Sequence, residues 1–259
     1  MSHVLILRPA AQAEELQQLL QQRAAQHKVP LRYEHASMLQ IRGYDDPSHS
    51  LAQILATPWD GAMMVSVNAA QYFAAQAQAW APNQAMPRCR WYAVGPTSAR
   101  AIARVVKRPV SCPWRQHNSD ALLALPELQN VAEQNWLVIR GRGGRELFAE
   151  TLRARGAKVT HLEVYERVPT APSAAQIRTW QQSVDTIMVS SAEQLGAFLA
   201  AVPRPALDWL ARCTWVVASS RLQQLLPAAI TKHVVVADSA ASFAMVEAWQ
   251  RALQSMKEA

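Results

Sequence analysis

The sequence predicts an α/β protein with two similar domains, each built on a mainly parallel sheet with helices on both faces. Short apolar runs alternate with helix-like segments along the chain, which is typical of strands joined by crossover helices. The runs are continuously apolar, which indicates that both faces of each sheet are covered. The chain has 259 residues, half of them hydrophobic, which is enough for two cores because folded domains usually contain about 100 to 200 residues.

The expected elements follow one another in a regular order. Strands are expected at Val4–Leu7, Ala62–Val67, Trp91–Val94, Trp136–Ile139, Thr186–Val189, Trp215–Ala218 and Val234–Ala237. Apolar residues at helical spacing predict helices at Glu14–Ala25, Ala69–Ala79, Ser98–Val106, Arg145–Arg155, Ala192–Ala201 and Ala240–Leu253. Two further strands, around Leu31–Ile41 and Lys158–Pro169, are unusually long. The second runs into the linker-like residues Pro169, Pro172 and Ser173, so these two strands are candidates for a crossing between domains.

A weak internal repeat supports two like domains. Arg8, Glu14, Tyr33 and Glu34 recur at one constant spacing as Arg140, Glu146, Tyr165 and Glu166, each set in a strand-helix-strand context. Val65 and Ser66 recur at a similar spacing as Val189 and Ser190. The shared order and spacing favour a duplicated unit. The sequence leaves open which pieces of the two copies pack together.

Charge and cysteine content narrow the classes of function. The chain has 26 Lys and Arg against 19 Asp and Glu, a net charge of +7, which favours anionic partners. It has no basic run, zinc finger or basic-aromatic interleaving, so we expect no nucleic-acid partner. No apolar stretch approaches the roughly 18 to 20 residues of a membrane span, so we expect no membrane contact. Cys89, Cys112 and Cys213 form no pair typical of a disulfide or metal site, which favours a cytoplasmic protein.

A glycine-rich turn is the first candidate for a ligand site. Arg140 ends a predicted strand, and Gly141, Arg142, Gly143, Gly144 and Arg145 follow it with three of the eight glycines in the chain. Glycines allow a tight turn and close approach of the backbone, and the start of a helix favours an anion. Arg142 and Arg145 would add bidentate contacts to carboxylates or phosphates. A tight turn with two solvated arginines is the alternative.

Polar residues follow other predicted strands. They are Ser66 and Asn68, then Gly95, Thr97 and Ser98, then Ser190 and Ser191. Each alone is typical of a helix N-cap, but together they would line the carboxyl ends of the strands, where open α/β sheets bind ligands. The chain lacks the dinucleotide and phosphate-loop motifs and the common nucleophile and zinc motifs. A reaction that depends on positioning and backbone donors is therefore favoured among enzymes.

Three segments together closely resemble bacterial uroporphyrinogen-III synthases. They are Val138–Leu147, Leu152–Val159 and Val164–Arg167. Weaker matches are Leu7–Pro9, Ser66–Ala70, Ala93–Ala99 and Val216–Leu222, so the resemblance spans nearly the whole chain. The chain departs from the family pattern at Ala218–Arg221.

The resemblance implies two doubly wound, flavodoxin-like domains joined by a two-stranded connection. Domain one would comprise residues 1–36 and 170–259, and domain two residues 37–169, with the ligand in a cleft between them. The family cyclises hydroxymethylbilane to uroporphyrinogen III, with inversion of the terminal pyrrole, loss of water and no cofactor. The eight carboxylates of this substrate would explain the basic charge. A monomer is the default expectation, and a transient contact with hydroxymethylbilane synthase is a further one.

The resemblance also implies roles for single residues. Tyr165 matches a tyrosine proposed to assist departure of the substrate's hydroxyl, and Ser98 matches a hydroxyl position in the second domain. Arg8, Ser66, Gly141, Gly143, Ser190 and Ser219 fall on positions that face the cleft.

Two other functions stay open on the sequence alone. A non-catalytic carrier or sensor for an anionic small molecule would share the same sheets, turns and charge, because fold does not fix function. A nucleotide-sugar or phosphoryl-transfer enzyme is disfavoured, because the chain lacks phosphate-loop and Mg²⁺ signatures.

Overall fold

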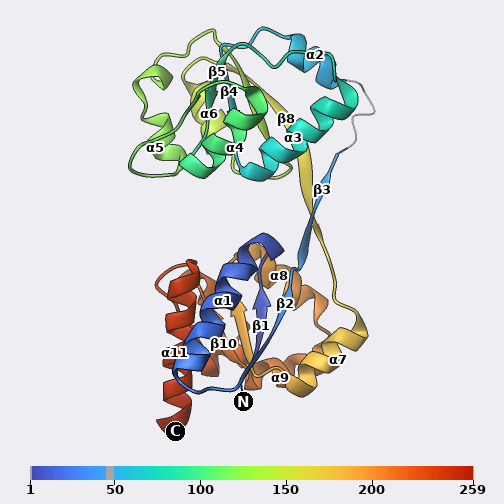
Figure 1. The fold of residues 1–259 in the computed structure, drawn as a ribbon, viewed down its shortest axis with the longest axis vertical. Helices are drawn as coiled ribbons and strands as arrows, with labels where there is room; N and C mark the ends of the chain where they lie inside the picture. Colours follow the sequence, from blue (N-terminus) through green and yellow to red (C-terminus); the bar gives the residue numbers. More distant parts are fainter. Residues whose placement is uncertain (1, 45–49, 259) are drawn as a thin grey trace. The chain divides into compact units, whose positions relative to one another are not determined.

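The computed structural model describes residues 2–44 and 50–258. It divides into two compact units, residues 1–40 with 168–259 and residues 41–167 (Figure 1). We call them unit 1 and unit 2. Each is an α/β unit built on one sheet, and this confirms the predicted fold class. The unit boundaries fall within two strands, β3 (Leu39–Gly43) and β8 (Lys158–Pro169).

Unit 1 contains a five-stranded sheet in the order β11-β10-β9-β1-β2. The strands are β1 (Ser2–Leu7), β2 (Leu31–Ala36), β9 (Thr186–Val189), β10 (Thr214–Val217) and β11 (Val234–Val236), all paired in parallel. The helices are α1 (Ala10–Gln26), α7 (Ala174–Ser183), α8 (Ala192–Ala201), α9 (Leu207–Arg212), α10 (Ser220–Gln224) and α11 (Ser242–Glu258). The pairing of β1 with β9 joins the start of the chain to its last third, which the sequence alone left open.

The core of unit 1 follows from the apolar pattern of its elements. Every residue of β1 is buried, as a central strand covered on both faces requires. In α1 the buried residues are Ala13, Leu16, Leu20 and Ala24, at the spacing that places them on one helix face. Ser173, expected in a linker, begins α7 through a capping box with Gln176.

Unit 2 contains a six-stranded sheet in the order β3-β8-β7-β4-β5-β6. Its other strands are β4 (Gly61–Met64), β5 (Arg90–Tyr92), β6 (Val110–Ser111) and β7 (Asn135–Gly141). The helices are α2 (Ser50–Ala56), α3 (Val67–Trp80), α4 (Pro96–Val106), α5 (Ser119–Leu123) and α6 (Leu147–Ala154). Two apolar clusters cover its sheet, one centred on Phe73 and Ile102 with α3 and α4, the other on Trp136 and Phe148 with α5 and α6.

With one exception, the predicted strands and helices are present, although several begin or end at other residues. The expected long strand around Leu31–Ile41 is wrong, because β2 ends at Ala36 and β3 begins at Leu39. At the break the backbone N–H of Met38 donates to Gln194 Oε1 at 2.7 Å, so it leaves the sheet ladder. The expected helix at Arg145–Arg155 begins only at Leu147, which places Arg145 in the preceding turn.

Candidate functional site

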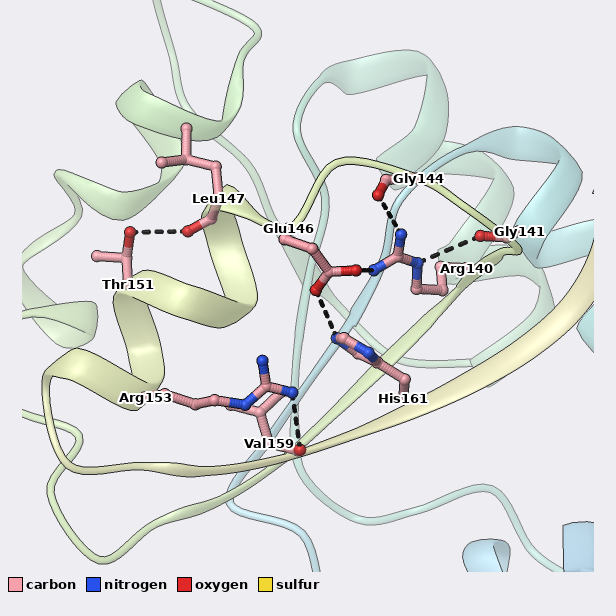
Figure 2. A network of polar contacts seen from close by, with 9 residues as sticks. All are labelled: Arg140, Gly141, Gly144, Glu146, Leu147, Thr151, Arg153, Val159 and His161. Atoms are coloured by element: carbon pink, nitrogen blue, oxygen red, sulfur yellow. Dashed lines mark hydrogen bonds and ion pairs between the residues drawn. The ribbon is translucent and has the colours of Figure 1, made fainter.

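The turn between β7 and α6 is built around the buried guanidinium of Arg140, which is 2% exposed. Figure 2 shows its three bonds. Nε donates to the carbonyl of Gly141 at 3.2 Å, Nη2 donates to the carbonyl of Gly144, and Nη1 donates to the carboxylate of Glu146. The last arginine of the strand therefore holds the glycine turn from inside.

Glu146 links this turn to β8. Its Oε1 accepts from Arg140, and its Oε2 lies 3.6 Å from Nε2 of His161 (Figure 2). Burial lowers the pKa of His161 below its usual value, although the charge of Glu146 acts in the opposite direction. His161 is therefore neutral near pH 7, and the charged partner of Glu146 in this network is Arg140.

Tyr165 packs directly over the glycine turn. It is 1% exposed, and a Cβ added at Gly141 would lie 2.4 Å from its ring. Glycine is therefore required at 141 by close approach of the ring. The carbonyl of Tyr165 accepts a hydrogen bond from the backbone N–H of Arg142 at 2.8 Å. The turn and the tyrosine thus fix one another.

A register shift places Tyr165 over this turn. Between β7 and β8 the pairing passes from Arg140 with Glu163 to Gly141 with Tyr165, so Val164 is an extra residue. Val164 and Tyr165 are consequently both buried in the cluster that includes Phe73. Strict alternation along β8 would instead place Val164 and Tyr165 on opposite faces of the sheet.

The hydroxyl of Tyr165 lies at the start of α3. It is 3.4 Å from Oγ of Ser66, and either group can be the donor. Ser66 also caps α3 by accepting from the backbone N–H of Ala69 at 3.1 Å. The ring of Tyr72 and the guanidinium of Arg167 each lie 5.7 Å from the Tyr165 ring centroid. These contacts orient the phenol without enclosing its hydroxyl in a strong internal hydrogen bond.

A cavity of about 280 Å³ lies at the carboxyl edge of this sheet. Apolar side chains, among them Met63, Val138 and Phe148, form part of its lining. Its arginines are Arg140, Arg145 and Arg167, and among the described lining residues there is no Asp or Glu. An apolar lining with several cations suits an anionic molecule that contains apolar rings. The complete lining is Met63, Val65, Ser66, Val94, His117, Asn118, Ser119, Val138, Arg140, Gly141, Gly144, Arg145, Phe148, Ala149, Tyr165 and Arg167.

The structure brings many of the sequence-predicted residues of unit 2 together in this cavity. They are Ser66, Arg140, Gly141, Gly144, Arg145 and Tyr165. The other predicted residues of this unit are Asn68, Gly95, Thr97, Ser98, Arg142 and Gly143, and none of these lines it. Gly95 is the N-cap residue of α4, and Gly143 occupies the left-handed region, with φ of 69°.

Arg142 lies beside a carboxylate, whereas Arg145 belongs to the cavity lining. Its side chain is 67% exposed, and Nη1 lies 3.9 Å from a carboxylate oxygen of Glu166. A hydrogen bond from Arg42 lowers the pKa of Glu166 below its usual value, so Glu166 is ionised at neutral pH. This carboxylate competes for Arg142, whereas Arg145 lines the cavity.

The remaining predicted residues belong to unit 1. Arg8 is 6% exposed; its Nε donates to Oγ of Ser190 at 2.9 Å, its Nη1 to Oγ of Ser242 at 3.1 Å, and its Nη2 to the carbonyl of Ala240. Ser191 caps α8 and Ser219 caps α10. Arg8 thus has the same character as its repeat partner Arg140, a buried arginine at a strand end that holds loop groups.

Four polar residues of the cavity lining were not predicted from the sequence: His117, Asn118, Ser119 and Arg167. The first three lie in and just after a loop without apolar periodicity. The sequence did hold a signal for this segment, because Asn118 precedes an apolar run and asparagine is a typical helix N-cap. In the structure Asn118 caps α5 by accepting from the N–H of Ala121 at 2.8 Å. Arg167 is two residues from Tyr165 in β8 and so shares its side of the strand.

The described residues show no cluster of metal-binding side chains, and two of the three cysteines have raised pKa values. They contain no group of three or more His, Cys, Asp or Glu that could hold a metal ion. The three cysteines are free, and burial raises the pKa of Cys89 to about 11 and that of Cys213 to about 12. Both are therefore protonated at neutral pH and are poor nucleophiles. No helix within the described ranges is long and apolar enough to span a bilayer.

Comparison with known proteins gives one consistent result. Residues 33–247 match the family model described as uroporphyrinogen-III synthase HemD. The chain is 38% identical to the uroporphyrinogen-III synthase of Salmonella typhimurium, over 62% of this chain and 67% of that protein. It is 34% identical to the Escherichia coli enzyme, over 77% of this chain and 83% of that protein.

Solved structures show the same fold at low sequence identity. A mutant uroporphyrinogen III synthase from Thermus thermophilus aligns with a TM-score of 0.61 and 17% identity, over 98% of this chain and 100% of that one. The uroporphyrinogen-III synthetase of Helicobacter pylori aligns with a TM-score of 0.58 and 14% identity, over 97% and 99% of the two chains.

Proposed function

The chain belongs to the uroporphyrinogen-III synthase family, whose members are hydro-lyases of tetrapyrrole biosynthesis, and we propose that it binds hydroxymethylbilane at the cavity of unit 2. The observation that carries this proposal is that Tyr165 belongs to the lining of a cavity whose charged lining residues are arginines. The substrate combines apolar pyrrole rings with many carboxylates. The lining offers both apolar surface and positive charge, and so fits both parts of the substrate.

Tyr165 is the proposed acid for the first step. The hydroxyl of the substrate leaves as water, which requires a proton, and the phenol O–H of Tyr165, a residue of the cavity lining, is the proposed donor. Ser66 Oγ, 3.4 Å away, can in turn donate to the phenolic oxygen as negative charge develops on it. A phenol is a weak acid, so its assistance is modest, and the electron-rich pyrrole supplies the rest of the driving force.

The later steps need positioning rather than further acid. Once the hydroxyl has left, the two ends of the linear tetrapyrrole must meet at the electrophilic carbon. Holding them in a fixed geometry lowers the barrier to ring closure. Of the cavity arginines, Arg145 and Arg167 hold carboxylates during this closure. The backbone of the glycine turn, itself held by Arg140, stays rigid while the substrate rearranges.

The two arginines of the turn should behave differently on mutation. We expect Arg145→Ala to raise KM by about five- to thirtyfold, the equivalent of about 1 to 2 kcal/mol, because it removes a cation from the cavity. Arg142→Ala should change KM by less than about threefold, because its side chain is exposed and lies beside Glu166. Steady-state kinetics at two salt concentrations test this. Equal KM values for both variants and the wild type would remove the turn from substrate binding.

The proposed reaction is tested by product identity. Porphobilinogen and its deaminase supply hydroxymethylbilane, and the products are oxidised and separated as porphyrin isomers. We expect predominantly the type III isomer with the chain present and type I without it. An isomer ratio equal to the no-enzyme control would instead favour a carrier or sensor of anionic small molecules.

We also propose a cellular compartment and an assembly state for the enzyme. We place it in the cytoplasm, where its three free thiols would remain reduced. A monomer that receives its substrate through transient contact with hydroxymethylbilane synthase is the simplest arrangement. Sedimentation of the two enzymes alone and mixed tests both statements.

A further inference from the structure

The loop between β6 and α5, residues 112–118, carries an unusually exposed tryptophan. Trp114 is 94% exposed, whereas Phe243, another exposed apolar side chain, is 60% exposed. Four other tryptophans, Trp91, Trp136, Trp215 and Trp249, are at most 2% exposed. A fully exposed indole gives up the stabilisation that burial of its large apolar surface would provide. Trp114 therefore contributes little to the packing of this chain.

The loop is anchored at both ends. Pro113 is buried, and Asn118 caps α5 through the N–H of Ala121. The Cβ of His117 lies 3.1 Å from the position that a Cβ on Gly95 would take, so the loop packs on the turn between β5 and α4. The exposure of Trp114 is thus a feature of a loop with fixed ends.

The loop stands at the rim of the cavity. β6 pairs in parallel with β5, so it ends at the carboxyl edge of the sheet, and the chain then leads into α5. His117, Asn118 and Ser119 line the cavity. Trp114 precedes His117 by three residues, and an extended chain spans at most about 3.6 Å per residue. Its Cα therefore lies within about 11 Å of a residue of the cavity lining.

The cavity is too small for a whole tetrapyrrole. Its volume of about 280 Å³ is at the low end of the roughly 300 to 1,000 Å³ that drug-sized ligands occupy. A molecule with four pyrroles and eight carboxylates must extend beyond it. We propose that Trp114 is a substrate-binding residue whose indole stacks on a pyrrole ring outside the cavity, and that neighbouring Arg115 meets a carboxylate of that ring. This inference rests on the proposed function.

The surroundings of Trp114 favour a small anionic ligand over a protein partner. Arg115, Gln116 and His117, which follow it, are all exposed and polar. A surface that binds proteins presents a continuous apolar patch with aromatic anchors at its centre. A single indole beside cationic and polar side chains matches a flat ring with carboxylate substituents, to which it offers a stacking face.

The first test is kinetic. Trp114→Ala should raise KM for enzymatically generated hydroxymethylbilane about tenfold and change kcat less than twofold, whereas Trp114→Phe should retain most of the affinity. Trp80→Ala is the matched control, because Trp80 is 42% exposed but ends α3, far along that helix from Ser66 at the cavity. Unchanged KM in Trp114→Ala would overturn the inference. Thermal midpoints equal to the wild type would show that both variants fold.

The second test measures contact directly. Acrylamide quenching of tryptophan fluorescence in the wild type, minus that in Trp114→Phe, isolates the contribution of Trp114. Uroporphyrinogen III, kept reduced, should protect the fluorescence of Trp114 from acrylamide. The fluorescence of Trp80, isolated in the same way with Trp80→Phe, should stay accessible to acrylamide. Equal quenching of Trp114 with and without uroporphyrinogen III would overturn the inference. If the wild type makes no type III isomer, the proposed function fails; if the wild type is active and Trp114→Ala matches it, only the role of Trp114 fails.

Discussion

Arg140→Met should destabilise unit 2 by about 3 kcal/mol, because it removes the donors that hold the turn between β7 and α6. Methionine fills much of the volume of the aliphatic stem, but it leaves the carbonyls of Gly141 and Gly144 without their donor. The cost stays below that of breaking a fully buried ion pair, because Glu146 is 43% exposed and can turn to water. Urea unfolding monitored by far-UV circular dichroism measures the change.

Glu146→Gln is the matched control for this prediction. The glutamine keeps an oxygen that can accept from Arg140, and the two carbonyl contacts of Arg140 remain, so we expect a loss of about 1 kcal/mol or less. kcat/KM should fall in Arg140→Met and remain close to the wild-type value in Glu146→Gln. An unfolding free energy for Arg140→Met equal to that of the wild type would show that the turn keeps its shape without the guanidinium.

For Arg140 and Arg8, the direction of the side chain could not be predicted from the sequence. The repeat identified both as equivalent strand-end arginines, and such positions suggested ligand binding. The structure shows both side chains buried and donating to nearby loop groups. An arginine after a strand has the same sequence signal whether its side chain turns outward or back under the loop, so only tertiary structure separates these cases. Their direct contact with substrate stays a prediction.

The elements that the sequence predicted share a strong local signal. Central strands such as β1 and β9 are continuously apolar, and long helices such as α1 repeat apolar residues at helical spacing. Short elements lack such a signal, and β6, with two residues, was missed. Missing β6 and α5 also concealed the loop between them, and with it His117 and Asn118 at the cavity.

The position of Tyr165 illustrates a second limit. The family resemblance identified the residue, but its burial beside Val164 depends on one extra residue in β8 opposite β7. A shift of one residue changes the face on which every later side chain lies. No propensity marks such a bulge in the sequence. The match between the tyrosine ring and glycine at 141 became visible only when the two strands were placed side by side.

Tyr165→Phe should lower kcat by about tenfold to a thousandfold and leave the fold intact. Phenylalanine keeps the ring that lies over Gly141 and beside Tyr72, so packing is conserved. It removes the O–H that we propose protonates the departing hydroxyl of a substrate bound in the cavity that Tyr165 lines. Each tenfold loss corresponds to about 1.4 kcal/mol in the barrier, and general-acid catalysis typically contributes about 10² to 10⁴ in rate. We expect a loss below this range or in its lower part, because the pyrrole itself activates the leaving group.

Tyr72→Phe supplies the control within the same aromatic pair. Its hydroxyl donates to the carbonyl of Ile41 at 2.9 Å, and Tyr72 is not part of the cavity lining. Its loss should therefore lower stability by about 1 kcal/mol and leave kcat unchanged. Tyr165→Ala should instead cost about 3 to 5 kcal/mol of stability, because it empties the space above the glycine turn. Normal turnover in Tyr165→Phe together with a low thermal midpoint in Tyr165→Ala would assign Tyr165 to packing alone, because the ring would then explain everything the residue does.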